Sequence, residues 1–386
     1  METIEAARPV CEQLNGSTAC AETETSTGSA GAEFWDALGR ARAGKDLTRD
    51  EIRALLRAEP GDQTAALFSL ADEVRARYVG DEVHLRGLVE FSSYCARNCA
   101  YCGLRRDNRK LERYRIPPDE IVSIAEYGAI LGYKTIVLQS GDDFWYSADM
   151  LADIITRIKG AADVAVTVCI GERSREEYAA IREAGADRFL LKHETADPEL
   201  YKALHPGMTL EERIMRLRWL KKLGFQVGSG NIVGLPGQTM DSLADDIVLM
   251  RDLDMDMAGI GPFIPHPDTP LAGAPQGQLE LVLKVVACTR LAMPWAHIPA
   301  TTAAGTVDPR GREKALQCGA NVVMPNITPV EYRKLYQIYP NKICISERAD
   351  SCRRCIENRI KGIGRDIGTG YGNCREYKPD IAYGMK

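Results

Sequence analysis

Short apolar runs and longer amphipathic stretches alternate along this chain from residue 82 onward. The apolar runs have the length of buried strands, and the stretches between them carry apolar residues three or four positions apart, which predicts helices. The predicted strands span residues 83–91, 134–139, 164–169, 188–192, 226–233, 257–262, 296–300 and 321–324. Strands and helices that alternate in this way form parallel β/α units. Eight units predict an α/β fold with a complete (βα)8 TIM-type barrel.

Helix-start signals support this alternation. A Ser or Thr at the N-cap accepts a hydrogen bond from the first turn, and a Glu three residues later completes a capping box. Such signals are present at Thr48 with Glu51, at Ser147, at Ser174 with Glu177, and at Thr209 with Glu212.

An open, doubly wound sheet is the alternative fold. Such a sheet usually has a Gly-x-Gly-x-x-Gly turn after its first strand. Here three cysteines occupy that position, and Gly228-Ser-Gly230 matches only the first part of the motif.

Four segments are expected along the chain. Residues 1–33 have almost no large apolar residues and are expected to be a disordered tail. A helical lead-in is predicted at 34–80, followed by the barrel at 81–326. Residues 327–386 form a C-terminal extension with a second group of cysteines.

Composition limits the classes of function. The chain has 386 residues, 45% of them apolar, and a formal charge of −5, which gives no basic footprint for nucleic acid. It has no apolar run long enough to span a membrane and no secretory signal at its start. Twelve cysteines without such a signal indicate a reducing compartment in which thiolates bind metal. We therefore expect a cytoplasmic protein.

Cys95, Cys99 and Cys102 lie within eight residues, directly after the first predicted strand. A structural zinc site needs four ligands, and a disulfide framework needs an even number of cysteines. Three thiolates on one tight loop suit a 4Fe–4S cluster whose fourth iron has no protein ligand. That open iron can bind a substrate or cofactor, and Tyr101 adds aromatic cover to the loop.

A second group consists of Cys344, Cys352 and Cys355. Three ligands at this spacing favour a second iron–sulfur cluster. A zinc site with a fourth ligand elsewhere and plain free thiols are the alternatives. Cys169, Cys288 and Cys318 fall in strand or helix patterns and are expected in the core.

The first cysteine spacing resembles that of the radical S-adenosylmethionine (SAM) superfamily. The resemblance implies that SAM binds the open iron and is cleaved reductively to methionine and a 5′-deoxyadenosyl radical. It also implies a SAM-binding set at the ends of the predicted strands. That set is Gln139, Ser140, Gly141, Lys192, Glu194, Arg213, Gly230 and Ile232. Lys192 stands where an Arg is common in the related enzymes. An ammonium cannot make the two parallel hydrogen bonds of a guanidinium, so the bidentate contact implied at this position is in doubt.

Longer segments resemble the HydE family of iron–iron (FeFe) hydrogenase maturases. They include Thr135-Ile-Val-Leu-Gln-Ser-Gly141, Val233-Gly-Leu-Pro-Gly-Gln-Thr239, Gly259-Ile-Gly-Pro-Phe-Ile-Pro-His-Pro-Asp-Thr-Pro270 and Cys318-Gly-Ala-Asn-Val-Val-Met-Pro-Asn326. The resemblance implies an enzyme that acts in assembly of the hydrogenase di-iron subcluster. Its radical would attack a sulfur-bearing substrate, a cysteine-ligated iron complex with carbon monoxide and cyanide.

The same resemblance implies roles inside the barrel. Ser140 and Tyr336 would lie near the radical centre. Thr167, Arg188, Thr301 and Thr302 would bind the substrate carboxylate. The implied partners are an electron donor such as ferredoxin or flavodoxin and the other hydrogenase maturases, with no nucleic acid and no membrane.

Three other functions are weighed against this one. Methylornithine synthase, a radical mutase, is similar in architecture and is the runner-up. Biotin synthase uses barrel cysteines for an inner cluster, and Thr167 and Gly228 occupy two of those positions here. An iron–sulfur electron carrier would explain two cysteine groups but not a full barrel.

Overall fold

The computed structural model describes residues 27–375. Its strands are β1 (Glu82–Leu85), β2 (Gly87–Ser92), β3 (Thr135–Ser140), β4 (Ala165–Cys169), β5 (Arg188–Leu190), β6 (Gln226–Ser229), β7 (Ile232–Val233), β8 (Met257–Ala258), β9 (Gly261–Pro262), β10 (Val322–Val323) and β11 (Asp366–Ile367). Its first helices are α2 (Thr27–Arg42), α3 (Arg49–Leu56), α4 (Asp62–Val79), α5 (Pro118–Ile130), α6 (Ala148–Ala161), α7 (Arg175–Glu183), α8 (Pro198–Leu204) and α9 (Leu210–Lys222). The later helices are α10 (Met240–Asp252), α11 (Leu279–Ala292), α12 (Thr302–Val307), α13 (Gly311–Leu316), α14 (Val330–Arg333) and α15 (Ala349–Gly362).

The centre of the fold is a six-stranded parallel sheet in the order β2-β3-β4-β5-β6-β8. The predicted parallel α/β fold is therefore confirmed. Pairing continues beyond β8 through single parallel bridges, and β1, which precedes β2, pairs with β10. The bridges join Met257 to His297, Pro299 to Val322, and Leu88 to Asn326.

Three of the predicted strands are interrupted. The expected strand 83–91 is divided into β1 and β2, which belong to different sheets. The expected strand 226–233 is divided into β6 and β7, and 257–262 is divided into β8 and β9. Gly230 lies at the break between β6 and β7 with φ of +154°, a conformation that ends regular strand geometry. The expected strand 296–300 pairs only through its two bridges, and Pro299 has no N–H to donate to a ladder.

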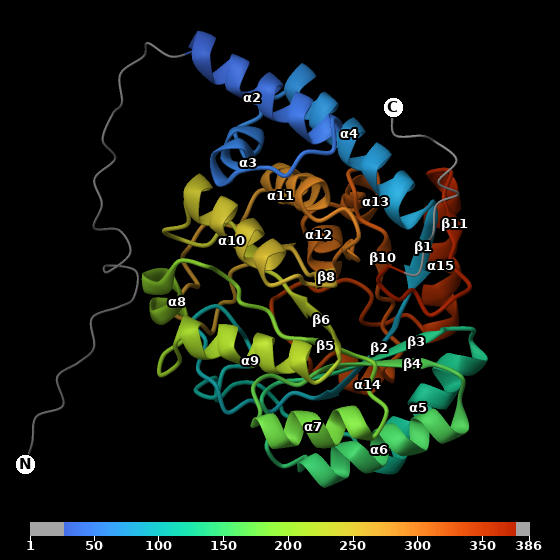
Figure 1. Cartoon of the computed structure of the whole chain (residues 1–386). Helices are drawn as coiled ribbons and strands as arrows, with labels where there is room; N and C mark the ends of the chain where they lie inside the picture. Colours follow the sequence, from blue (N-terminus) through green and yellow to red (C-terminus); the bar gives the residue numbers. More distant parts are fainter. Residues whose placement is uncertain (1–26, 376–386) are drawn as a thin grey trace, which may run out of the picture.

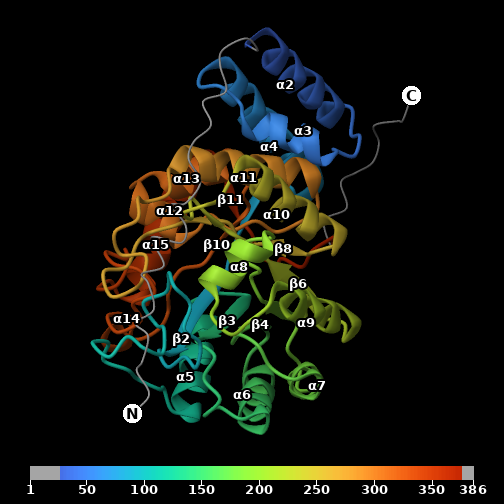
Figure 2. The same ribbon diagram turned by 90° about the vertical axis from the view of Figure 1, so that its left-hand side faces the viewer.

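Helices cover the outside of the sheet. Figure 1 shows α5, α6, α7 and α9 around the strands of the first half, and neighbouring helices in this series pack on one another. Figure 2 shows α2, α3 and α4 as a layer above α10, α11 and α13, where α4 packs on α11 and α3 on α10. Apolar residues such as Ile136, Val166 and Phe189 fill the space between sheet and helices. No helix in the described residues is both long and apolar enough to cross a membrane.

The predicted N-caps are confirmed. Thr48, Ser147, Ser174 and Thr209 each accept a hydrogen bond from a backbone N–H of the first helical turn. The capping boxes at Thr48 and Ser174 are complete. At Thr209 the expected partner, Glu212, pairs instead with Arg216 one turn later, at 3.6 Å.

The start of the first described helix differs from the expected tail. Helix α2 begins at Thr27, inside the range 1–33, whereas residues 1–26 lie outside the described part of the chain. Phe34, Ala37 and Leu38 are buried one turn apart and hold this helix against α3 and α4.

The C-terminal segment enters the fold from the side opposite to the strand ends discussed below. Strand β11 pairs with β1, and the residues after it bond to the first residues of three central strands. Thr135 Oγ1 and Arg188 Nη2 both donate to the Tyr371 carbonyl at 2.8 Å, and the Cys374 N–H donates to Gln226 Oε1 at 2.9 Å. Residues 366–374 therefore cover the N-terminal ends of the strands.

Candidate functional site

A cavity of about 380 Å³ lies at the carboxyl ends of the central strands. In parallel β/α folds this is the end where ligand sites form, because the βα loops meet there. The cavity is lined from the cysteine loop, the ends of β3 and β5, and the segment around residues 336–344.

The cysteine loop forms one wall of the cavity, and the thiols of Cys95, Cys99 and Cys102 all line it. Backbone bonds fasten the loop: the Ala96 N–H donates to the Asp142 carbonyl at 2.9 Å, and Gly103 to Ile338, also at 2.9 Å. The predicted set of three cysteines is thus gathered in one place.

All three thiols would have to lose a proton to bind iron. Burial raises the pKa of Cys102 to about 12 and also raises those of Cys95 and Cys99, so iron would have to displace the protons. Within residues 27–375, no three His, Cys, Asp or Glu side chains converge closely enough to share one ion. A cubane instead places each thiolate on a separate iron, so it accepts wider spacing.

Gly141 allows the β3 loop to lie directly against the cysteine loop. A Cβ at this position would be 2.3 Å from the Tyr94 carbonyl oxygen and 2.6 Å from Cys95 Cβ. Gln139, Ser140 and Gly141 therefore line the cavity beside the first cysteine, as predicted from the sequence.

Tyr101 is held by a neutral histidine. Its hydroxyl lies 2.9 Å from His205 Nε2, and His205 Nδ1 lies 3.0 Å from the Tyr201 carbonyl. Burial, with the nearby Arg213, lowers the pKa of His205 to about 3. Nδ1 therefore carries the proton that it donates to the carbonyl, and Nε2 accepts from Tyr101. This pairing has no local signature, since His205 lies 104 residues from Tyr101.

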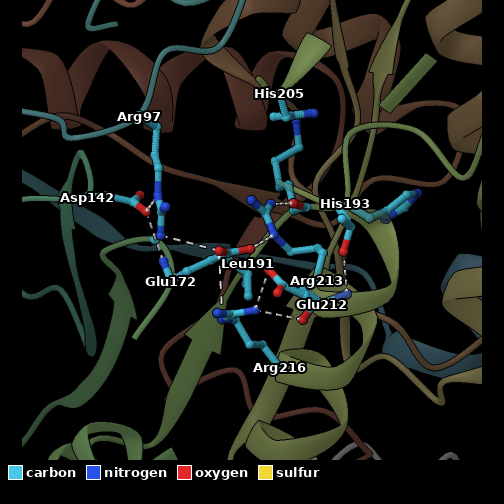
Figure 3. Close-up of polar contacts among 12 residues, drawn as sticks. Arg97, Asp142, Glu172, Leu191, His193, His205, Glu212, Arg213 and Arg216 are labelled. Carbon is cyan, nitrogen blue, oxygen red and sulfur yellow. Dashed lines mark hydrogen bonds and ion pairs between the residues drawn. The ribbon is translucent and has the colours of Figure 1, made fainter. Parts of the chain in front are cut away.

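A network of buried charges joins the cysteine loop to helix α9 (Figure 3). Glu172 accepts from Arg213 Nε at 2.7 Å and pairs with Arg97 at 3.4 Å and Arg216 at 3.7 Å. Arg97 also donates to Asp142 at 2.7 Å. Arg213 was predicted here, whereas Glu172, Asp142 and Arg97 were missed. The signal for the two acids was their position, Asp142 two residues after the end of β3 and Glu172 three residues after the end of β4.

Lys192 and Glu194 line the opposite wall and pair at 2.9 Å. Glu194 has φ of +66°, a left-handed conformation that a non-glycine residue adopts at some energetic cost. Its N–H donates to the Gly230 carbonyl at 2.9 Å. A Cβ on Gly230 would lie 2.0 Å from the Gly259 carbonyl oxygen, so glycine is required there. Ile232 lines the cavity next to this crossing, whereas Gly230 is not among the lining residues.

Three comparisons with known proteins agree with this geometry. Residues 89–250 match the radical SAM superfamily. The chain is 52% identical to the FeFe hydrogenase maturase subunit HydE of Thermotoga maritima over 328 residues, which cover 85% of this chain and 94% of that protein. This chain belongs to the HydE family of radical SAM enzymes.

Methylornithine synthases are more distant relatives. The 3-methylornithine synthase of Methanosarcina acetivorans is 29% identical over 84% of this chain and 91% of its own length. A crystal structure of methylornithine synthase (PylB) superposes with a TM-score of 0.77 at 26% identity, covering 86% of this chain and 97% of that one. The architecture is thus shared between two radical SAM families, and the higher identity belongs to HydE.

In this HydE-family chain the cavity continues inward past Ser140 to Tyr336, and both residues line it. Tyr336 is buried, and the Lys342 ammonium lies 5.1 Å from its ring centroid. Lys342 in turn pairs with the buried carboxylate of Glu90. Burial and the Glu90 charge raise the pKa of Tyr336 well above its ordinary value, so its phenol stays protonated.

The four residues expected to bind a carboxylate do not gather in one place. Thr301 and Thr302 line the cavity, but Thr167 and Arg188 are not among its lining residues. Arg188 is the first residue of β5 and bonds instead to Thr135 and to the C-terminal segment. The amino end of a strand lies away from the cavity, which is at the carboxyl ends. The sequence showed that Arg188 begins a strand but not which groups its side chain would contact.

The second cysteine group is only partly assembled. Cys344 lines the cavity with φ of +61°, and a hydrogen bond from Cys352 lowers its pKa. Cys355 is exposed on α15. Cys288 and Cys318 are buried as predicted, whereas Cys169 lines the cavity rather than the core.

Proposed function

We propose that this chain cleaves SAM reductively and uses the resulting radical on a sulfur-bearing substrate, as a step in assembly of the FeFe-hydrogenase di-iron subcluster. The observation that carries the proposal is that one cavity contains both the cysteine loop with its charged neighbours and an interior lined by Ser140, Tyr336, Thr301 and Thr302. When bound, the cluster supplies one electron to SAM, which yields methionine and the 5′-deoxyadenosyl radical.

Residue roles at the SAM end follow from their chemistry. Arg213, fixed by Glu172, would hold the carboxylate of SAM, and Glu194 its ammonium or ribose. Backbone groups of Gln139, Ser140 and Gly141 would hold the amino group. Lys192 would add a single charged donor, and Gly230 with Ile232 would lie against the adenine ring.

Ser140 and Tyr336 would be the residues nearest the radical, further inside the cavity. A protonated Tyr336 hydroxyl can donate a hydrogen bond to the substrate there. The substrate would be a small or organometallic molecule derived from cysteine. A methylornithine-synthase-like mutase is the second candidate, since the fold is shared with that enzyme.

The domain organisation is also a proposal. The bridges from β8 through residues 297 and 299 to β10 support a complete (βα)8 barrel over residues 81–326. Residues 34–80 would be a helical lead-in, and residues 327–386 a C-terminal extension with the second cysteine group.

Cys344, Cys352 and Cys355 would bind a second iron–sulfur cluster, which the closeness of the first two supports. The electron would come from ferredoxin or flavodoxin, and the product would pass to other maturases. We propose a cytoplasmic location for these steps.

The deciding experiment compares Cys99→Ala with the double variant Cys352→Ala/Cys355→Ala. Both are reconstituted anaerobically with iron and sulfide and given SAM and dithionite, and 5′-deoxyadenosine is measured by chromatography. Cys99→Ala should give none, because the cluster loses one of three anchors. The double variant should lose part of its iron but keep SAM cleavage. Retained cleavage in Cys99→Ala would refute the assignment.

The substrate class is tested in the wild-type protein. A sulfur-linked adenosyl adduct formed with a cysteine-derived thiol would support the maturase. Deoxyadenosine that forms only with lysine, together with a rearranged amino acid, would favour the mutase.

A further inference from the structure

Asp246 is a fully buried carboxylate on α10, next to the two chain segments that carry Glu194 and Ile232. Within residues 27–375, no Lys or Arg nitrogen lies within 4.0 Å of its oxygens. A carboxylate in the interior of a protein is unfavourable unless hydrogen-bond donors satisfy it. The groups that satisfy Asp246 therefore show what this charge organises.

Three groups from two segments of the chain surround the carboxylate. The Ala196 N–H donates to Oδ1 at 2.5 Å, and Asn231 Nδ2 donates to Oδ2 at 2.7 Å. His193 Nε2 lies 3.3 Å from Oδ1. The His193 ring is also fixed at its other nitrogen, because Nδ1 lies 2.9 Å from Ser229 Oγ. Asp246 thus joins residues 193–196 to residues 229–231 at one point.

Glu194 lies between two of these contacts, in a left-handed conformation with φ of +66°. A non-glycine residue keeps such a conformation only where its surroundings hold it. Two backbone bonds contribute, from Glu194 N–H to the Gly230 carbonyl at 2.9 Å and from Ile232 N–H to the Glu194 carbonyl at 3.1 Å. Asp246 adds a contact on either side of Glu194 and a third to the residue before Ile232. It therefore fixes two residues that line the cavity.

We propose that Asp246 is a positioning residue for SAM, which fixes the wall that receives the nucleoside half of the cofactor. This inference rests on the ribose and adenine roles proposed above for Glu194 and Ile232. Asp246 does not line the cavity and acts only through the groups that it holds. Loss of its charge should weaken contacts to the nucleoside and leave those of Arg213 and the cysteine loop to the methionine half unchanged.

The test compares Asp246→Asn with Asp256→Asn. Asp256 is also buried and also accepts from a backbone N–H, that of Val227 at 2.8 Å. It directly precedes β8, so it lies at the amino ends of the strands and away from the cavity. Both variants and the wild-type protein are reconstituted anaerobically. Their affinities for SAM, 5′-deoxyadenosine and methionine are measured by calorimetry.

Asp246→Asn should bind SAM and 5′-deoxyadenosine about tenfold more weakly than the wild-type protein, because an amide nitrogen replaces one acceptor oxygen and then faces another donor. Its affinity for methionine should not change. Asp256→Asn should keep all three affinities. In the protein without cluster or SAM, hydrogen exchange in residues 193–197 and 230–234 should become faster in Asp246→Asn only.

Two further variants separate positioning from a general loss of stability. Asn231→Asp/Asp246→Asn exchanges donor and acceptor at the same net charge, so it should recover part of the affinity for SAM. Asn231→Ala removes one donor and keeps the buried carboxylate. It should weaken nucleoside binding even if Asp246→Asn does not fold.

The proposal is overturned if Asp246→Asn and Asn231→Ala bind SAM as tightly as the wild-type protein. It is equally overturned if Asp256→Asn weakens SAM binding to the same extent, or if methionine binding falls as much as 5′-deoxyadenosine binding. These outcomes do not depend on turnover, whereas cleavage of SAM by the wild-type protein tests the proposed function separately.

Discussion

Single carboxylates organise the charged residues of the site. Glu172 is almost fully buried and contacts three arginines, one from the cysteine loop and two from α9. It therefore links the loop that carries Cys95, Cys99 and Cys102 to the helix that carries Arg213. Under the proposed function, Glu172 would act on SAM binding through the groups that it positions.

Glu172→Gln should weaken SAM binding roughly tenfold and lower the free energy of unfolding by about 3 kcal/mol. The reason is that breaking a buried pair leaves the remaining charge uncompensated. Calorimetry with SAM and urea unfolding would measure the two effects. Glu212→Gln is the matched control, since Glu212 is half exposed and pairs only with Arg216. Equal behaviour of the two variants would show that Glu172 does not position the site.

At the scale of elements, the first residues of the helices could be predicted from nearby residues, whereas the ends of the strands could not. The four N-caps were correct because a cap bonds to its own first turn. The division of residues 226–233 into β6 and β7 depends on the close contact between Gly230 and Gly259, which is 29 residues away. Such a contact has no local signature.

The segment from β11 to Cys374 is the element that the sequence left without an interpretation. It accepts hydrogen bonds from two buried arginines, Arg188 at the Tyr371 carbonyl and Arg86 at the Gly372 carbonyl, at 2.8 and 3.1 Å. The described residues after 362 therefore provide hydrogen-bond acceptors for arginines in the interior of the fold.

Truncation after Arg365 should lower the melting temperature by roughly 5–10 °C. Both arginines would lose an acceptor, and each unpaired buried donor costs about 1–3 kcal/mol. Truncation after Arg375 is the control, because it keeps all of the contacts described for this segment. Thermal unfolding followed by circular dichroism compares the two. If both truncations melt at the same temperature, residues 366–375 do not stabilise the fold.

At the scale of the whole molecule, charge is distributed unevenly. The chain carries a net charge of −5, yet residues 97–115 contain seven Arg or Lys and only two Asp or Glu. We name Arg105, Arg106, Arg109 and Lys110 the basic collar. Arg106 and Lys110 have side chains that are 61% and 80% exposed, and the Arg106 N–H bonds to the Arg97 carbonyl of the cysteine loop at 2.8 Å. The collar thus lies next to the cysteine loop, with Arg106 paired to Asp107 at 3.2 Å and Lys110 to Asp268 at 2.5 Å.

An acidic electron donor should dock on this collar. Arg106→Glu/Arg109→Glu should slow flavodoxin-driven SAM cleavage about tenfold at low salt, and the difference should shrink at high salt as charges are screened. Dithionite-driven cleavage should not change. Arg218→Glu/Arg354→Glu makes the same change of charge at exposed sites on α9 and α15. A donor that works equally well with both double variants docks elsewhere.

Local sequence was sufficient for the parts of this protein that depend on neighbours in the chain. The strand and helix periodicity, the N-caps and the three-cysteine loop each involve residues within a few positions of one another. Their physical basis is backbone hydrogen bonding and side-chain spacing, which a short segment already contains.

The tertiary structure determined which charged side chains form ion pairs and hydrogen bonds with one another. Glu172 reaches Arg213 across 41 residues, Glu90 reaches Lys342 across 252, and Arg188 turns to the C-terminal segment instead of the cavity. Ion pairs and buried hydrogen bonds depend on distances set only when the strands assemble and exclude water. For this reason the three-cysteine loop was recognisable from the sequence, whereas the partner of each buried charge was not.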